Sequence, residues 1–188
     1  MNPSTALTLA SSQLSSVAEG DAQYLTFVIN GEMFAINILG VKEIIEYGNI
    51  TPIPLMPEFI RGVINLRGAV VSVVDLNARF GNIASTITRR SCIVIIETLS
   101  QEGEHQGETQ DIGVVVDAVS EVLTIPRNEI EPPPSFGAKI RSDFISGMGK
   151  VNGKFVILLN TQKVLSIDEM AQLHDISHRP DAAIAVTQ

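Results

Sequence analysis

Short runs of apolar residues, separated by turn-forming residues, make up most of the chain. The runs are rich in Val, Ile and Leu, and turns interrupt them about every 8–12 positions, as in small all-β proteins. Roughly ten strands are predicted in this way, and they indicate an all-β fold built as barrels or as a sandwich. The predicted strands cover residues 24–29, 32–38, the two halves of 59–76 around a turn at 65–68, 90–99, 112–117, 119–125, 144–149 and the hairpin 150–159.

Two of the predicted hairpins turn at an Asn-Gly pair, Asn30-Gly31 and Asn152-Gly153. Asn-Gly between apolar runs is the strongest short-range signal for a type I′ turn. The two hairpins resemble each other in sequence, which fits two related small β modules. A third hairpin turn is predicted at residues 65–68, where Asn65 and Gly68 suit a tight turn, and it lifts Leu66 and Arg67 onto a tip between two very apolar strands.

The remaining segments are less regular. Residues 38–46 place Val41, Ile44 and Ile45 at i, i+3 and i+4, which allows at most two turns of helix or a bent continuation of the strand. The other expectations are an extended connector with three prolines at 50–57, an exposed loop at 100–111, a short helix at 160–173, a flexible arm at 1–22 and a flexible tail at 174–188.

Charge and composition exclude several classes of function. The net charge of −8 and the pI near 4.8 argue against binding to a nucleic-acid backbone or to anionic lipid. The single cysteine, Cys92, excludes an intrachain disulfide and suits a reducing compartment. No apolar run is long enough to span a bilayer, and the first 20 residues do not have the pattern of a signal peptide. We therefore expect a cytoplasmic protein without direct membrane insertion.

Residues that could carry chemistry are scarce. The three histidines lie in the expected loop and tail and have no metal-ligand spacing, so no metal site is predicted. Asp75 and Asp117 each follow a Val-Val pair, and we interpret them as turn caps at strand ends and not as a catalytic pair. We predict no catalytic residue and no cofactor. The apolar residues exceed what the interiors of two small barrels need, which favours a surface for protein contacts.

Three stretches resemble the CheW-like domain of bacterial chemotaxis adaptors. They are residues 57–76, with Gly-Val-Ile-Asn-Leu-Arg-Gly at their centre, residues 113–122 and residues 145–149. The resemblance covers about residues 23–173. It implies two five-stranded SH3-like β-barrels, roughly 30–88 and 89–165, packed through a shared apolar seam, with the N-terminal strand possibly shared and a short C-terminal helix.

The resemblance also implies a function and a set of sites. Such adaptors couple methyl-accepting chemoreceptors to the regulatory domain of the histidine kinase CheA, in arrays near the membrane, and are not enzymes. The positions implied for kinase binding are Val41, Ile44 and Gly62, and those implied for receptor binding and coupling are Glu43, Leu66 and Arg67. An arginine on an apolar tip needs a carboxylate partner, and Glu43 could supply one.

Other functions stay open at this point. An adaptor of a pilus-type chemosensory pathway would have a similar sequence, and a small β-barrel hydrolase or ligand-binding enzyme is a remote alternative. A nucleic-acid-binding barrel is disfavoured by the acidic charge and few aromatic residues. The chain departs from related sequences in its longer N-terminal arm, in a charged insertion at 101–110, and in Ser72, where proline is frequent.

Overall fold

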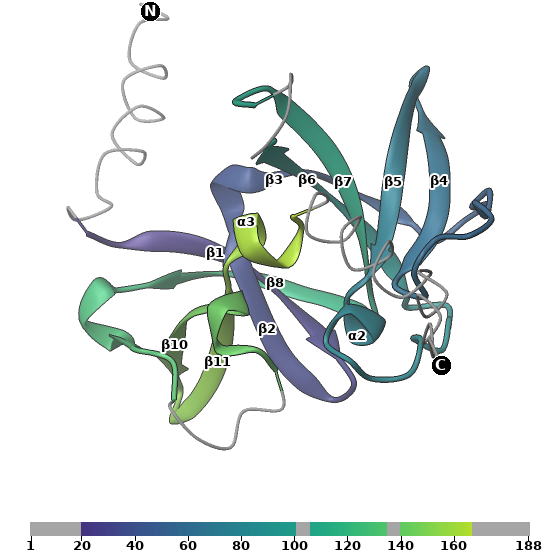
Figure 1. Cartoon of the computed structure of the whole chain (residues 1–188). Coiled ribbons are helices and arrows are strands. Elements are labelled where there is room, and N and C mark those ends of the chain that lie inside the picture. The colour runs from purple at the N-terminus through teal and green to yellow at the C-terminus, as the bar shows by residue number, and fades with distance from the viewer. Residues whose placement is uncertain (1–19, 101–105, 135–139, 167–188) are drawn as a thin grey trace, which may run out of the picture.

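The computed structural model describes residues 20–100, 106–134 and 140–166, and in this part of the chain the fold is all-β, as predicted (Figure 1). The expected flexible tail, and nearly all of the expected arm, lie outside the described residues. The strands are β1 (Ala22–Ile29), β2 (Glu32–Asn37), β3 (Val41–Glu46), β4 (Ile60–Leu66), β5 (Ala69–Asp75), β6 (Cys92–Leu99), β7 (Thr109–Val116), β8 (Ala118–Ile125), β9 (Ile130–Glu131), β10 (Ile145–Val151) and β11 (Lys154–Leu159).

The described part of the chain also has five short helical segments, four between strands and one after the last strand: η2 (Ile38–Gly40), α2 (Leu76–Arg79), η4 (Arg127–Glu129), η5 (Ser142–Phe144) and α3 (Thr161–Val164). The C-terminal helix predicted at 160–173 is present as α3, which Asn160 caps by accepting from the Lys163 amide. Residues 167–173 of that prediction lie outside the described residues. The loop predicted at 100–111 is shorter than expected, because β7 already begins at Thr109.

The strands form two sheets. One has the order β8-β1-β2-β11-β10-β9 and the other has the order β3-β6-β7-β5-β4. Hydrogen bonds between the described strands close neither sheet into a complete barrel. Both sheets are mostly antiparallel, with one parallel pair each, β2 with β11 and β5 with β7.

The sheets divide the chain differently from the split at residues 30–88 and 89–165 that we expected. The five-stranded sheet takes residues 41–116, while β1 and β2 pair with β8 and β11 in the six-stranded sheet. The N-terminal strands thus belong with the C-terminal half of the chain. The cause is long-range pairing, which the apolar pattern of a single strand does not reveal.

Three two-residue turns share one backbone geometry. Asn30 and Gly31 have φ of 50° and 79°, and Asn152 and Gly153 have φ of 50° and 75°. Positive φ at both central residues is the mark of the predicted type I′ turn. The β4–β5 turn has the same signs, with Arg67 at 52° and Gly68 at 87°.

Residues 38–46 are not a helix beyond the short η2 turn. β3 pairs with β6 along its length, with a register shift between Val41 and Glu43. Ile44 is opposite Val94 and Ile45 is opposite Ile93. Neighbouring strand residues point to opposite faces, so Ile44 and Ile45 do not share the apolar face that a helix would have given them. The bent continuation of the strand was the correct alternative.

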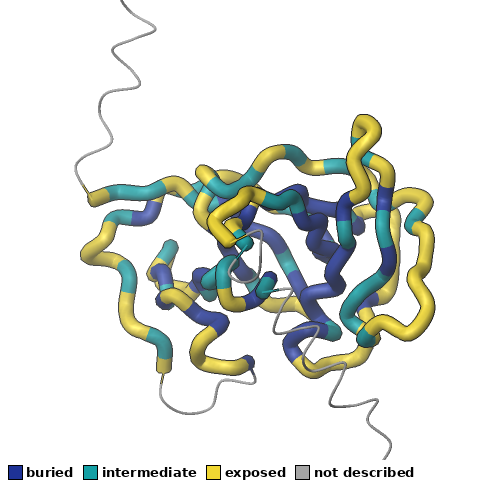
Figure 2. Tube along the Cα trace, turned by 45° about the horizontal axis from the view of Figure 1, so that its top comes forward, coloured by how far each residue is buried: buried dark blue, intermediate teal, exposed yellow. Residues whose placement is uncertain are grey.

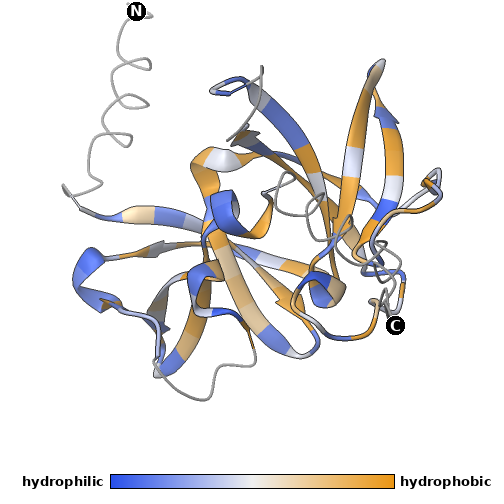
Figure 3. Ribbon diagram, in the orientation of Figure 1, coloured by the Kyte–Doolittle hydropathy of each residue, from blue (hydrophilic) through white to orange (hydrophobic). Residues whose placement is uncertain are grey.

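Residues from both sheets fill one large core. Figure 2 shows the buried segments gathered between the two sheets, and Figure 3 shows that these strand segments are the apolar ones. Phe27 and Phe34 come from the six-stranded sheet, while Val94 and Val114 come from the five-stranded sheet. A shared apolar seam was predicted, and the structure has one. A smaller core lies on the other face of the five-stranded sheet, with Ile64, Val71, Val73, Ile93, Ile95 and Val115.

Asp75 is a structural residue, as predicted. It is fully buried and caps α2 by accepting from the Ala78 amide. Arg61 donates to one of its oxygens from Nε at 3.0 Å and from Nη2 at 2.9 Å, and Ser85 donates to both. A buried carboxylate with this many donors ties β4 and the loop after α2 to the end of β5.

Gly62 lies at a bulge in β4 and allows the chain before it to approach closely. The Thr51 amide donates to the Val63 carbonyl, and the Val63 amide donates to the Thr51 carbonyl, both at 2.9 Å. A Cβ on Gly62 would lie 2.1 Å from the Thr51 oxygen, and its φ is +140°. Only glycine fits this position.

We therefore predict that Gly62→Ala lowers the free energy of unfolding by about 2 kcal/mol or more, because the clash is with backbone and the φ is strained. Urea denaturation of the purified variant measures this loss. Gly48→Ala is the matched control, since its Cβ would meet nothing closer than the Glu46 oxygen at 4.0 Å. Equal stability of the two variants would contradict the role assigned to Gly62.

Candidate functional site

A shallow depression of about 350 Å³ lies where the β4–β5 turn leans over β3. It brings together the three residues implied for receptor binding and coupling, Glu43, Leu66 and Arg67. Lys42, Ala69 and Asp111 also line it, and no sequence pattern indicated these three residues. We call this surface the hairpin-tip site.

Arg67 and Glu43 form a bidentate ion pair across the hairpin-tip site. Arg67 Nη1 donates to Glu43 Oε1 at 3.0 Å, and Nη2 donates to Oε2 at 2.8 Å. The Arg67 side chain is 79% exposed, whereas Glu43 is only 24% exposed. The pairing expected from the sequence is confirmed. An exposed pair of this kind contributes at most about 1 kcal/mol to stability, so its main effect is to fix where the arginine lies.

The ion pair lies at one end of the small core of the five-stranded sheet. Glu43 is opposite Ile95, and Ile45 on the same face is opposite Ile93. Ile93 and Ile95 are buried in this core, and Leu66 packs against it. Paired residues of an antiparallel sheet share a face, so Glu43 points toward this core. Through this pair, Arg67 holds the β4–β5 turn over the end of the small core.

A second charged group borders the site. Lys42 Nζ lies 3.0 Å from an Asp111 oxygen and 3.1 Å from a Glu97 oxygen. The Asp111 and Glu97 carboxylates raise the pKa of Lys42 above its usual value. The sequence did not indicate this cluster, because we expected Asp111 in a loop and it lies in β7. The hairpin-tip site therefore has alternating charges, each paired within the fold.

The positions implied for kinase binding do not gather in the hairpin-tip site. Gly62 is buried beneath the Thr51 carbonyl and offers no side chain to a partner. Val41 is half-buried and packs against the large core. Ile44 is 43% exposed, so of the three it is the one with a large apolar side chain at the surface.

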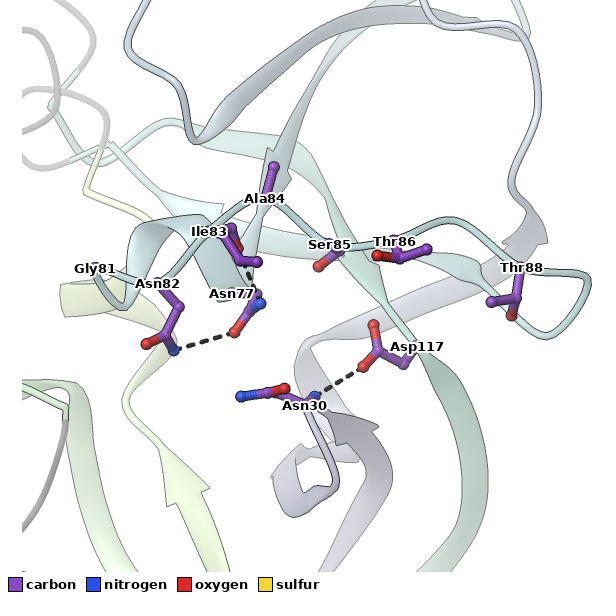
Figure 4. A pocket seen from close by; sticks show the side chains of 10 residues that line it. All are labelled: Asn30, Asn77, Gly81, Asn82, Ile83, Ala84, Ser85, Thr86, Thr88 and Asp117. Atoms are coloured by element: carbon purple, nitrogen blue, oxygen red, sulfur yellow. Dashed lines mark hydrogen bonds between the residues drawn. The ribbon is translucent and has the colours of Figure 1, made fainter.

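A larger depression of about 640 Å³ lies where the β1–β2 turn meets the loop after α2 (Figure 4). Asp117 accepts from the Asn30 amide at 2.7 Å, so it caps a turn as predicted. Asn77 donates to the Ile83 carbonyl and accepts from Asn82. The polar groups drawn in Figure 4 are amides and hydroxyls apart from one carboxylate, and that carboxylate already serves the turn.

Features of other classes of site are missing from the described residues. That part of the chain holds no group of three His, Cys, Asp or Glu side chains that could bind a metal ion. It also has no helix with the length and apolar character that crossing a bilayer requires. The hairpin-tip site, built from paired charges around an apolar edge, is suited to binding a protein surface.

Comparison with known proteins gives a consistent result. The family model described as the CheW-like domain matches residues 23–169. The chain is 31% identical over 155 residues to the chemotaxis protein CheW of Klebsiella aerogenes, covering 82% of this chain and 88% of that protein. It is also 31% identical over 153 residues to the chemotaxis protein CheW of Rhizobium meliloti, covering 81% and 93%. The crystal structure of scaffolding protein TtCheW from Thermoanaerobacter tengcongensis has a TM-score of 0.65 at 37% identity, covering 74% of this chain and 88% of that one.

The three turns of shared geometry allow the role of Arg67 to be tested. Asparagine tolerates positive φ, so Arg67→Asn should keep the turn and change the free energy of unfolding by no more than about 1 kcal/mol. The reverse change, Asn152→Arg, places arginine at φ of 50° in a turn where asparagine is the better residue. It should lower the free energy of unfolding by about 1–2 kcal/mol. Chemical denaturation of both variants measures the difference. A loss above 2 kcal/mol for Arg67→Asn would show that the fold itself requires this arginine.

Proposed function

The chain belongs to the CheW-like family of chemotaxis adaptor and scaffold proteins, which are not enzymes, and we propose that it works by holding two partners at two surfaces. The partners are methyl-accepting chemoreceptors and the regulatory domain of the histidine kinase CheA. The protein acts in the receptor arrays, on the cytoplasmic side. The matches favour this adaptor over the hydrolase that the sequence left open.

The hairpin-tip site is the surface that we assign to receptor coupling. The observation that supports this most directly is the choice of residue at the turn. Asn30 and Asn152 occupy the equivalent positions of the other two turns, where asparagine suits positive φ. Arginine at φ of 52° is less favourable there, by about 1–2 kcal/mol. Arg67 occupies this position despite the backbone cost, and its side chain is 79% exposed. A contact of Arg67 with a partner outside the chain would explain both.

The shape of the site fits the helical tip of a receptor. Leu66 supplies an apolar edge, and the Arg67–Glu43 pair supplies a fixed donor beside it. A helix laid into such a depression would meet apolar contacts along its centre and a charge at the rim, which is the helix-in-groove mode of recognition. The kinase is assigned to the three positions that the resemblance implies, of which Ile44 is exposed, Val41 is half-buried and Gly62 is buried.

We predict that Arg67→Asn leaves the protein folded but weakens its binding to the receptor by about tenfold, or about 1.4 kcal/mol, and so lowers receptor-coupled kinase activity. Kinase autophosphorylation in reconstituted arrays of receptor, kinase and adaptor measures this. The matched control is Arg127→Asn, since Arg127 is an exposed arginine that lies in η4 and does not line the hairpin-tip site.

A charge exchange separates two explanations of that loss. If Arg67 only fixes the turn, the double variant Glu43→Arg with Arg67→Glu restores the pair and restores activity. If Arg67 contacts the receptor directly, the double variant stays inactive. Full activity of the single Arg67→Asn variant would contradict the assignment of this surface.

A further inference from the structure

Two asparagines of the chain are followed by glycine, Asn30 and Asn152. In such a pair the backbone nitrogen of glycine can attack the asparagine side chain, because glycine has no side chain to hinder the approach. The reaction turns the amide into a carboxylate and needs only water. Both pairs are exposed and share one backbone geometry, with φ of 50° at each asparagine. The two turns are therefore a matched pair that differ mainly in their surroundings.

The turn at Asn30 is anchored to the rest of the six-stranded sheet. Its amide donates to Asp117 Oδ2 at 2.7 Å, as Figure 4 shows, and the Asp117 amide donates to the Val28 carbonyl at 2.9 Å. The two strands that it joins also have outer neighbours, β8 beside β1 and β11 beside β2. A carboxylate formed at residue 30 would lie close to the Asp117 carboxylate, and the two like charges would repel.

The turn at Asn152 has less support. β9 is paired with β10 only as far as Gly149, and β2 is paired with β11 only at Ile157 and Leu158. Among the described strands, residues 150–155 thus pair only with each other. Figure 1 shows this turn at a corner of the six-stranded sheet, away from the β1–β2 turn. A hairpin tip with few contacts opens locally at a lower free energy than a turn held on both sides.

Charge favours the reaction at the same turn. Lys150 and Lys154, both exposed, lie on the two strands beside it. In β9 and β11, the strands paired with β10, the one carboxylate is that of Glu131, opposite Met148. Positive charge stabilises the deprotonated Gly153 nitrogen that attacks, and it stabilises the carboxylate of the product.

We propose that Asn152 is a site of spontaneous covalent modification and that Asn30 is protected from it. When the turn opens, the Gly153 nitrogen forms a bond to Asn152 Cγ. The side-chain nitrogen of Asn152 leaves as ammonia, and it takes the proton that the Gly153 nitrogen has lost. Water then opens the five-membered imide at either carbonyl and gives aspartate or isoaspartate. This inference does not depend on the proposed function.

The modification changes the surface of the β10–β11 hairpin. It places a negative charge between Lys150 and Lys154, and isoaspartate adds one carbon to the backbone of a two-residue turn. Phe155, which is 50% exposed and opposite Lys150, lies beside this change. The protein therefore acquires with age a second form, in which this hairpin differs in charge and shape.

Incubation of the purified full chain at physiological temperature, followed by peptide mapping with mass spectrometry, measures both rates in one sample. Chromatography separates the aspartate and isoaspartate products, which have equal mass. We expect Asn152 to react about tenfold or more faster than Asn30, since a difference of about 1.4 kcal/mol in the free energy of opening gives this factor. Equal rates, or a faster reaction at Asn30, overturn the inference. Absence of product at Asn152, while the free peptide of residues 150–155 reacts to completion, also overturns it.

Two variants test the effect of charge. Lys150→Gln with Lys154→Gln should lower the rate at Asn152 by about threefold and leave the rate at Asn30 unchanged. Asp117→Asn should raise the rate at Asn30 alone, because it removes the neighbouring carboxylate. Unchanged rates in both variants would overturn the role that we give to charge.

Variants that carry the product carboxylate give a second, independent measurement. Asn152→Asp should keep the thermal midpoint of the wild type, because aspartate also tolerates positive φ. Asn30→Asp should lower it, because the new carboxylate meets that of Asp117. A larger loss for Asn152→Asp than for Asn30→Asp would contradict the protection assigned to Asn30.

Discussion

The packing of the two sheets against one another is the interaction on which the rest of the molecule depends. Each sheet covers the apolar face of the other, and the rings of Phe27, Phe34, Phe80 and Phe144 follow one another across the seam with centroid separations of 6.3, 5.3 and 6.4 Å. Arg79, only 7% exposed, lies 4.7 Å from the Phe144 ring and 5.1 Å from the Phe59 ring. Its Nε donates to the Val164 carbonyl of α3. One guanidinium of α2 thus contacts the residue before β4, η5 and the C-terminal helix. Its charge favours particular positions over the rings, which a neutral side chain would not do.

A rigid interior lets the surface keep conformations that are unfavourable in themselves. Asn30 and Asn152 take positive φ at turns where asparagine is a common choice. Arg67 and Leu55 take the same region without that advantage, and both are highly exposed. The free energy that these two residues cost is small beside that of the core, so the fold tolerates them. At Arg67 this strain supports the proposal that the residue makes a contact outside the chain.

Local features of the fold could be predicted from the sequence, whereas long-range ones could not. Asn-Gly pairs located two hairpins, because a type I′ turn depends on neighbours in the chain. The pair of Arg67 with Glu43 is a long-range contact, and the resemblance to the CheW-like domain implied it, while the need of an arginine on an apolar tip for a carboxylate agreed with it. A shared N-terminal strand was foreseen, but the placement of β2 beside β11 was not predicted, because an apolar strand does not specify its partner. The sequence also did not predict the close approach of Thr51 to Gly62 or the left-handed φ of Leu55, for a related reason. Both depend on how the connector docks on β4, and three prolines indicated only that it is extended.

β4 carries residues of both sites that we assign to partners, Gly62 for the kinase and Leu66 for the receptor. Gly62, one of the positions implied for kinase binding, lies in this strand beside the bonds between Thr51 and Val63, and Leu66 of the hairpin-tip site follows three residues after Val63. Three residues of a strand span only about 10 Å. A receptor at the hairpin-tip site and a kinase near Gly62, as we propose, would therefore lie close together, with the same strand beneath both. Their binding free energies can be linked through direct contact between them and through the fixed strand, so the adaptor needs no change of conformation to couple them.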